Sequence, residues 1–146
     1  MLEVELQSRL IDAAKDAGGF GKKLSSKFLV GVSDLLIQLP NFPTVLIECK
    51  CDHAPVNEST LVRVSTSPLQ RKFLGDFSSA GGVGGVCLFV ANKKGRNPDW
   101  FWFLATSDIL INEITFDRLK TRAKVRRRGQ PWPIEEIVQD IVTGRR

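Results

Sequence analysis

Twenty residues, Gly31–Lys50 (GVSDLLIQLPNFPTVLIECK), constrain the fold of this chain more than any other stretch. Two strand-like runs, Val30–Leu39 and Thr44–Cys51, flank the segment Pro40–Pro43. The two prolines and the asparagine of that segment favour a turn, and β-rich runs on both sides of a turn are typical of paired strands. The sequence therefore predicts a β-hairpin.

Charged residues interrupt the second, otherwise apolar run. Side chains on a strand alternate between its two faces, so Glu48 and Lys50 share one face while Cys49 points to the other. Charges beside a core are costly unless they pair or serve a site. The hairpin also folds Asp34 back beside Glu48. We therefore expect two acids and a lysine to converge.

These three side chains suit metal-assisted hydrolysis of a phosphodiester. Asp34, Glu48 and the backbone carbonyl of Cys49 offer the oxygen ligands that Mg²⁺ prefers. The metal would lower the pKa of a bound water and polarise the phosphate. Lys50 would position that water or offset charge on the phosphorus. The alternative interpretation is a plain ion pair of Lys50 with one of the acids at a sheet edge.

The remaining pattern predicts a mixed α/β domain, with a small central sheet and helices around it. The expected elements, in chain order, are a helix at Leu2–Ala17, a loop at Cys51–Thr66, a helix capped by Ser67 and ending near Ala80, a buried strand at Val86–Ala91, a strand at Trp100–Thr106, helix at Ser107–Lys120 and a last helix at Pro133–Val142. Leu69, Phe73 and Phe77 form the apolar stripe expected of the middle helix.

Four consecutive aromatic residues, Trp100–Phe103, lie in the second of these strands. Because they alternate between faces, one pair is expected in the core. The other pair is expected to stack on bases or to cover a dimer interface, and we favour the interface.

The excess of positive over negative charge lies at the end of the chain. The 146 residues carry a net charge of +5, and we expect them to form a single domain, 1–146. Residues 1–117 hold 12 basic and 13 acidic side chains, whereas residues 118–146 hold 9 basic and 3 acidic ones. This basic C-terminal region, with Arg126, Arg127 and Arg128 contiguous, predicts contact with a phosphate backbone. A merely solvated tail is the alternative.

Composition excludes several classes of protein. With 42% hydrophobic and 25% charged residues, the chain is typical of globular proteins and not of fibrous ones. Its apolar runs are too short to cross a bilayer. Three cysteines are too few for a disulfide scaffold, so we expect a protein of the reducing cytoplasm.

Rival sites are less well supported by the sequence. Cys49, Cys51 and His53 are too few for a structural zinc site, because Cys49 is expected to point into the core. A Ser-His-Asp triad would have to use His53, the single histidine, and the chain lacks the G-x-S-x-G motif of many serine hydrolases. The glycines of GGVGG precede a strand, whereas a phosphate-binding loop precedes a helix.

G-V-S-D, followed by a hairpin and I-E-C-K, resembles the PD-(D/E)XK nuclease superfamily. More narrowly, it is similar to the VRR-NUC branch and to the related Holliday junction resolvases of phages and archaea. The resemblance extends from about Glu5 to Ala91 and includes the helix that begins S-P-L-Q. It implies a restriction-endonuclease-like core, and the sequence departs from the usual pattern at Ser33, where the family has proline.

The resemblance also implies roles for individual residues. Asp34 and Glu48 would bind Mg²⁺ or Mn²⁺, and Lys50 would be the catalytic lysine. A glutamate of the first helix contributes to the metal site in this group, and Glu5 matches it best, with Glu3 as the alternative. Gln70 matches a glutamine that approaches the active site, although an amide facing solvent is the other interpretation.

The function implied is that of a metal-dependent, structure-specific DNA endonuclease, most similar to Holliday junction resolvases, which act as homodimers. Alternatives are a nicking or restriction-type enzyme on linear duplex DNA, a catalytically inert DNA-binding module, and an RNA-cutting enzyme. A small nuclease domain also fits a virus-encoded protein acting in its host cell. The basic residues expected to hold DNA are Lys22, Lys23, Lys27, Arg126, Arg127 and Arg128.

Overall fold

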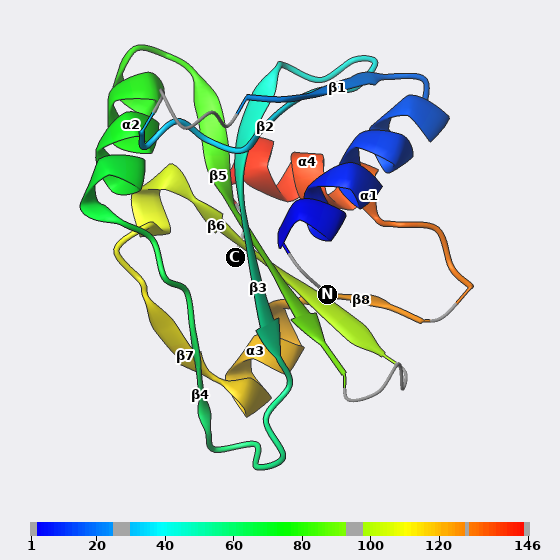
Figure 1. Cartoon of the computed structure of the whole chain (residues 1–146), viewed down its shortest axis with the longest axis vertical. Helices are drawn as coiled ribbons and strands as arrows, with labels where there is room; N and C mark the ends of the chain where they lie inside the picture. Colours follow the sequence, from blue (N-terminus) through cyan, green and yellow to red (C-terminus); the bar gives the residue numbers. More distant parts are fainter. Residues whose placement is uncertain (1–2, 25–29, 93–97, 128, 145–146) are drawn as a thin grey trace.

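A mixed six-stranded sheet forms the centre of the computed structural model, which describes residues 3–24, 30–92, 98–127 and 129–144 (Figure 1). Its strand order is β1-β2-β3-β5-β6-β8. Only β3 and β5 run parallel, and every other neighbouring pair is antiparallel. The strands are β1 (Phe20–Lys23), β2 (Leu35–Gln38), β3 (Val45–His53), β5 (Val83–Ala91), β6 (Asp99–Ala105) and β8 (Lys124–Arg126).

Both faces of this sheet are covered. Helices α1 (Glu3–Asp16) and α4 (Ile134–Thr143) pack on one face and lie on the same side of the sheet in Figure 1. The other face carries α2 (Pro68–Ser79), the short α3 (Phe116–Arg122) and a small second sheet of β4 (Leu61–Arg63) and β7 (Glu113–Thr115). The predicted α/β class, with a small mixed sheet between helices, is confirmed.

The covered sheet explains why the aromatic strand offers no interface. Phe101 and Phe103 lie in the core between the sheet and α1 and α4, whereas Trp100 and Trp102 lie in the core on the α2 face. All four side chains are buried. The expectation that one pair forms a dimer or base-stacking surface is therefore wrong, because a sheet covered on both faces buries both sets of side chains.

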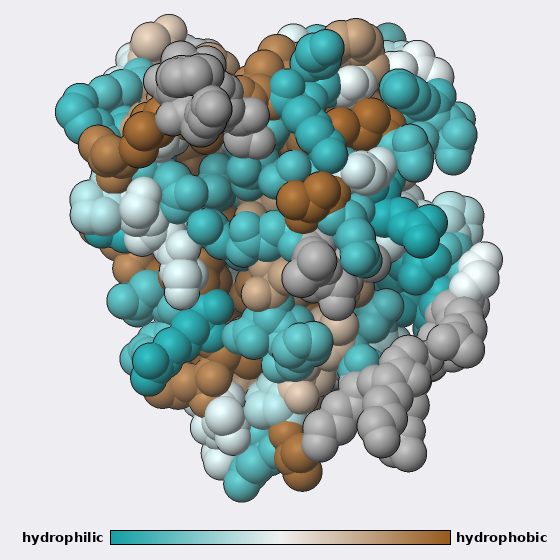
Figure 2. All heavy atoms as spheres, in the orientation of Figure 1, coloured by the Kyte–Doolittle hydropathy of each residue, from teal (hydrophilic) through white to brown (hydrophobic). Residues whose placement is uncertain are grey.

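The remaining exposed apolar residues are scattered. Large exposed side chains come from several elements, among them Val4, Phe20, Leu61 and Val125. In Figure 2, polar residues separate the apolar ones on the face shown. The apolar surface on that face is therefore divided rather than continuous.

The hairpin is confirmed, with Leu35 opposite Ile47 and Asn41 at a φ of 67° in the turn. Helix α2 is also confirmed, with Ser67 as its N-cap and Pro68 in its first turn. Its buried side chain is Leu74, whereas Leu69, expected in the apolar stripe, is 52% exposed. The start of α2 is thus placed correctly by its cap.

Two predicted segments are wrong. Residues 51–66 are not one loop, because β3 continues to His53 and β4 follows. Residues 107–120 are not one helix but a 3₁₀ turn (Thr106–Asp108), β7 and the first part of α3. Strands β4 and β7 pair with Val62 opposite Ile114, and both side chains enter the core on the α2 face. This pairing joins distant parts of the chain, so local periodicity does not reveal it.

The glycines before Val86 serve packing. A Cβ at Gly84 would lie 2.9 Å from Cδ2 of Leu74, and one at Gly85 would lie 2.6 Å from the carbonyl oxygen of Leu104. Strand β5 therefore runs too close to α2 and β6 for larger residues, which is a common use of glycine inside a sheet. No helix among the described residues is long and apolar enough to cross a membrane.

Candidate active site

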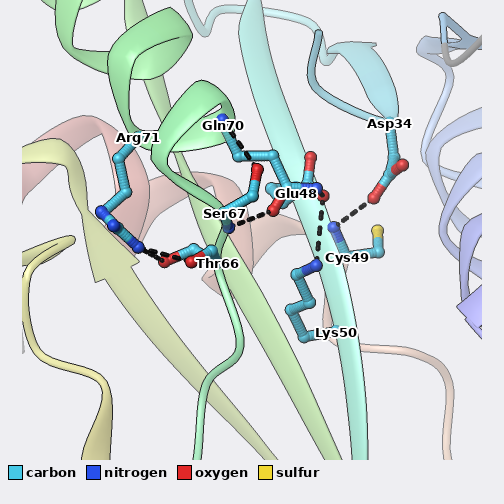
Figure 3. A network of polar contacts seen from close by, with 8 residues as sticks. All are labelled: Asp34, Glu48, Cys49, Lys50, Thr66, Ser67, Gln70 and Arg71. Carbon is cyan, nitrogen blue, oxygen red and sulfur yellow. Dashed lines mark hydrogen bonds and ion pairs between the residues drawn. The ribbon is translucent and has the colours of Figure 1, made fainter. Parts of the chain in front are cut away.

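Asp34 lies at the open end of the hairpin, just before β2 begins at Leu35. The register that places Leu35 opposite Ile47 places Asp34 beside Glu48. Oδ2 of Asp34 accepts a hydrogen bond of 2.7 Å from the backbone N–H of Cys49, as Figure 3 shows. Just before the start of β2, the carboxylate of Asp34 thus takes the place of a backbone acceptor and is fixed to the strand that carries Glu48.

Glu48 and Lys50 occupy the face of β3 that is covered by α2. They pair in register with Val86 and Leu88, whose side chains belong to the core on that face. Glu48 is only 2% exposed, and Lys50 is 14% exposed. Nζ of Lys50 lies 3.6 Å from Oε1 of Glu48. The predicted convergence of Asp34, Glu48 and Lys50 is therefore present in the structure.

Gln70 reaches this cluster from the first turn of α2. Its Nε2 donates a hydrogen bond of 2.6 Å to Oε1 of Glu48, and its Oε1 accepts one of 2.9 Å from the backbone N–H of Ser67. Figure 3 shows Ser67 and Gln70 on the α2 side of Glu48. The interpretation of Gln70 as a solvent-facing amide is therefore wrong.

Burial dominates the electrostatics of the two acids. The pKa of Glu48 is raised to about 8, first by burial and then by the nearby charge of Asp34, with Lys50 opposing both. The pKa of Asp34 is also raised by burial, against the hydrogen bond from Cys49 and the charge of Lys50. Each acid therefore lacks enough compensation for its charged form. A bound cation is the kind of partner that would supply it.

The donor set fits a hard divalent cation. Oε2 of Glu48 is buried and has no hydrogen-bond partner among the described residues. On an antiparallel strand the N–H and C=O of one residue point to the same neighbour, so the Cys49 carbonyl faces the side where Asp34 lies. Two carboxylates and a carbonyl are ligands that Mg²⁺ and Mn²⁺ accept.

The structure does not bring Glu5 into this cluster. Glu5 is exposed on α1, a helix that packs on the opposite face of the sheet. Its charge and that of Glu3 act instead on Cys51, whose pKa is raised to about 11, mainly by burial. Among the described residues, no three His, Cys, Asp or Glu side chains form a metal-binding group. A helix glutamate as a further ligand stays a prediction.

The lysines expected to bind DNA near the first strand are only partly described. Lys22 and Lys23 are exposed on β1, the edge strand beside β2. Lys27 and Arg128 lie outside the described residues. A role of these side chains in DNA binding stays a prediction.

Arg126, in the basic C-terminal region, is engaged within the fold. Nη1 of Arg126 lies 4.0 Å from Oδ2 of Asp99, and its guanidinium lies 5.0 Å from the ring centre of Trp132. Trp132 packs in the core beneath α1 and α4, opposite the face of Glu48. Arg127 is exposed. The idea of a free basic tail is therefore wrong for Arg126, since β8 makes this segment an edge of the central sheet.

Sequence reasoning missed two contributions to the site. The spacing Ser67-x-x-Gln70 is that of a capping box, in which the two residues bind each other. This contact could have been predicted from the sequence, but only the N-cap role of Ser67 was. Arg71 donates hydrogen bonds from Nη1 to the carbonyl oxygen of Thr66 and, over 3.3 Å, to Oγ1 of Thr66. No motif in the sequence indicated that second contact.

No family model matches the sequence, and no curated protein matches it. Among solved structures, the chain is similar to Hjc, a Holliday junction resolvase of the archaeon Archaeoglobus fulgidus, with a TM-score of 0.53, 12% identity and coverage of 84% of this chain and 89% of that one. A VRR_NUC domain aligns with a TM-score of 0.44 and 26% identity over 63% of this chain and 86% of that one. The resemblance noted from the sequence is confirmed at the level of fold: the chain has the fold of the archaeal resolvase Hjc.

Proposed function

We propose that this protein is a divalent-metal-dependent DNA endonuclease that hydrolyses phosphodiester bonds in branched DNA, as Holliday junction resolvases do. One observation carries the proposal: Asp34, Glu48 and Lys50 converge at the open end of the hairpin, and the buried Oε2 of Glu48 has no partner among the described residues. The likeness in fold to the archaeal resolvase supports it.

Each side chain has a distinct part in this proposal. Asp34, Glu48 and the Cys49 carbonyl hold the cation, which when bound supplies Lewis acidity and positive charge at the scissile phosphate. Lys50 points its ammonium group to the same site and stabilises negative charge that develops on the phosphate oxygens. Gln70 donates to the carboxylate of Glu48 and keeps it in place.

The DNA is held, in this proposal, on the face of the sheet that carries Glu48. A hollow of about 450 Å³ on that face is lined by Ile111, Glu113, Ile114, Arg118 and Arg122. The side chain of Ile114 belongs to the same core as Leu88, the strand neighbour of Lys50. The two arginines stand one helical turn apart on α3, and guanidinium groups bind phosphate well.

A cleavage assay on matched substrates tests the proposal. A four-way junction, a flap and a linear duplex of the same sequence are incubated with Mn²⁺ and with EDTA. We expect the junction to be cut fastest and EDTA to stop cleavage. Equal cutting of the linear duplex would favour a restriction-type enzyme, and binding without cutting would favour an inert module. Size measurement with and without junction tests the expected homodimer.

A further inference from the structure

The amide of Gln70 is held at both of its ends. The backbone N–H of Ser67 donates to Oε1 of Gln70 over 2.9 Å, while Oγ of Ser67 accepts a hydrogen bond of 3.1 Å from the backbone N–H of Gln70. These two bonds form a capping box at the start of α2. The other end of the same amide, Nε2, lies 2.6 Å from Oε1 of Glu48.

The capping box decides which way the amide points. A backbone N–H can only donate, so the atom that faces Ser67 must be the amide oxygen. The amide NH₂ group of Gln70 is therefore directed at Glu48. Reversal of the amide would break two hydrogen bonds at once, one to Ser67 and one to Glu48.

This arrangement also distinguishes the two oxygens of Glu48. Oε1 accepts the bond from Gln70 and lies 3.6 Å from Nζ of Lys50. Oε2 is buried and has no hydrogen-bond partner among the described residues. The donors are gathered on one oxygen, and the other has no donor among the described residues.

We propose that the capping box of α2 positions the metal site: Ser67 orients Gln70, and Gln70 fixes the carboxylate of Glu48 so that Oε2 faces the divalent cation. The inference rests on the proposed function. Arg71 supports the same turn, because it binds the backbone carbonyl and Oγ1 of Thr66, the residue before the cap (Figure 3). Ser67 and Arg71 are positioning residues in this scheme, since neither contacts Glu48.

The residue at position 70 supports a role beyond capping. Glutamate serves a capping box as well as glutamine does and interacts better with the positive end of the helix dipole. Glutamate at this position would, however, set a carboxylate against Oε1 of Glu48, where the amide now donates. Glutamine satisfies both the cap and the buried acid.

A double-mutant cycle tests the proposal with Mn²⁺ titrated into the full chain by calorimetry. We expect Gln70→Ala to weaken Mn²⁺ binding about 10-fold, the lower end of the range for outer-shell partners of a metal. Ser67→Ala keeps the backbone N–H that holds Oε1 of Gln70 and removes only the Oγ that caps the helix, so we expect it to weaken binding by a smaller factor. The double variant should bind as weakly as Gln70→Ala alone, because Ser67 acts through Gln70. Ser67→Asp, which restores a cap acceptor, should bind within about twofold of the wild type.

Controls separate this outcome from a loss of folding. Lys72→Ala removes an exposed ion pair with Asp76 on the same helix and should leave Mn²⁺ binding unchanged. Ser67→Gly removes Oγ at a helix cost of only a few tenths of a kcal/mol, and it should weaken binding as Ser67→Ala does. Unchanged affinity in Ser67→Gly and Gln70→Ala, with normal binding by the wild type, would overturn the inference and leave the proposed function standing. A wild type that binds no Mn²⁺ at millimolar concentration would overturn both.

Discussion

The backbone N–H of Cys49 donates a hydrogen bond of 2.7 Å to Oδ2 of Asp34, so the strand that carries Glu48 and Lys50 also holds the second acid of the site. Asp34 does not depend on a metal for its orientation. The bond fixes one carboxylate oxygen of Asp34 to the backbone of Cys49, the residue that follows Glu48. The hairpin thus brings the two acids together through its backbone.

Asp34→Asn tests this arrangement. The amide oxygen of asparagine can still accept the bond from Cys49, but the negative charge is lost. We expect the variant to fold and its Mn²⁺ affinity to fall at least roughly 100-fold. This is the largest loss typical of an outer-shell partner, and Asp34 is proposed as a direct ligand. Calorimetry measures the affinity, with Asp76→Asn on the exposed side of α2 as the control. Equal Mn²⁺ affinity in wild type and Asp34→Asn would exclude Asp34 as a ligand.

The raised pKa of Glu48 predicts a pH-dependent stability for the metal-free protein. Its pKa is 4.5 ordinarily and about 8 in the fold, so the folded state holds this proton more tightly than the unfolded state. The stabilisation is complete below pH 4.5 and is lost as pH rises through 8. Asp34, whose pKa is also raised, acts in the same direction.

Urea unfolding in EDTA at a series of pH values measures this effect. The free energy of unfolding should fall between pH 4.5 and pH 8 in the wild type and should fall less in Glu48→Gln. Mn²⁺ added at pH 8 should restore stability to the wild type but not to the variant. The same pH slope in both proteins would contradict the account.

Arginines of the basic C-terminal region have different surroundings: Arg118 and Arg122 line the hollow beside α3, whereas Arg126 is engaged within the sheet. The double substitution Arg118→Ala/Arg122→Ala should weaken binding of a four-way junction and lower the slope of log affinity against log salt by about 2, as expected for two lost phosphate contacts. Arg126→Ala should leave that slope unchanged, because Arg126 is engaged with Asp99 and Trp132. The opposite pattern would place the phosphate contacts at Arg126 and not at the arginines of α3.

Gly31, the glycine of G-V-S-D, precedes the hairpin and packs against the first turn of α2. Its φ is +86°, and a Cβ there would lie 2.9 Å from Cβ of Leu69, in the first turn of the helix that presents Gln70. We expect Gly31→Ala to lower the free energy of unfolding by about 1–3 kcal/mol and to reduce cleavage as well. Gly81→Ala has a similar φ of +93° with no atom within 4 Å, so it should cost stability without reducing cleavage.

The hairpin and the start of α2 could be predicted because their signals are local. Prolines and Asn41 mark the turn, charged residues interrupt an apolar strand, and Ser67 precedes Pro68 at a helix start. Strands β4 and β7 could not be predicted, because each has three residues and is stabilised by pairing with the other. Periodicity of apolar residues suggested a helix over residues 107–120, and its absence suggested a loop over residues 51–66.

The site was predictable in part for similar reasons. Alternation along β3 placed Glu48 and Lys50 on one face, and the hairpin register brought Asp34 to them. Charge counting along the chain could not reveal that Arg126 pairs with Asp99 of a neighbouring strand. A sum of charges does not show which of them already have partners within the fold.

Cleavage of a four-way junction by wild type and Lys50→Ala, each with and without Mg²⁺, tests whether Lys50 and a divalent metal act together in hydrolysis. We expect the wild type to cut only when Mg²⁺ is present, Lys50→Ala to show no measurable cutting, and both proteins to bind the junction. Cleavage by a pure, folded Lys50→Ala protein at the wild-type rate would contradict this role of Lys50.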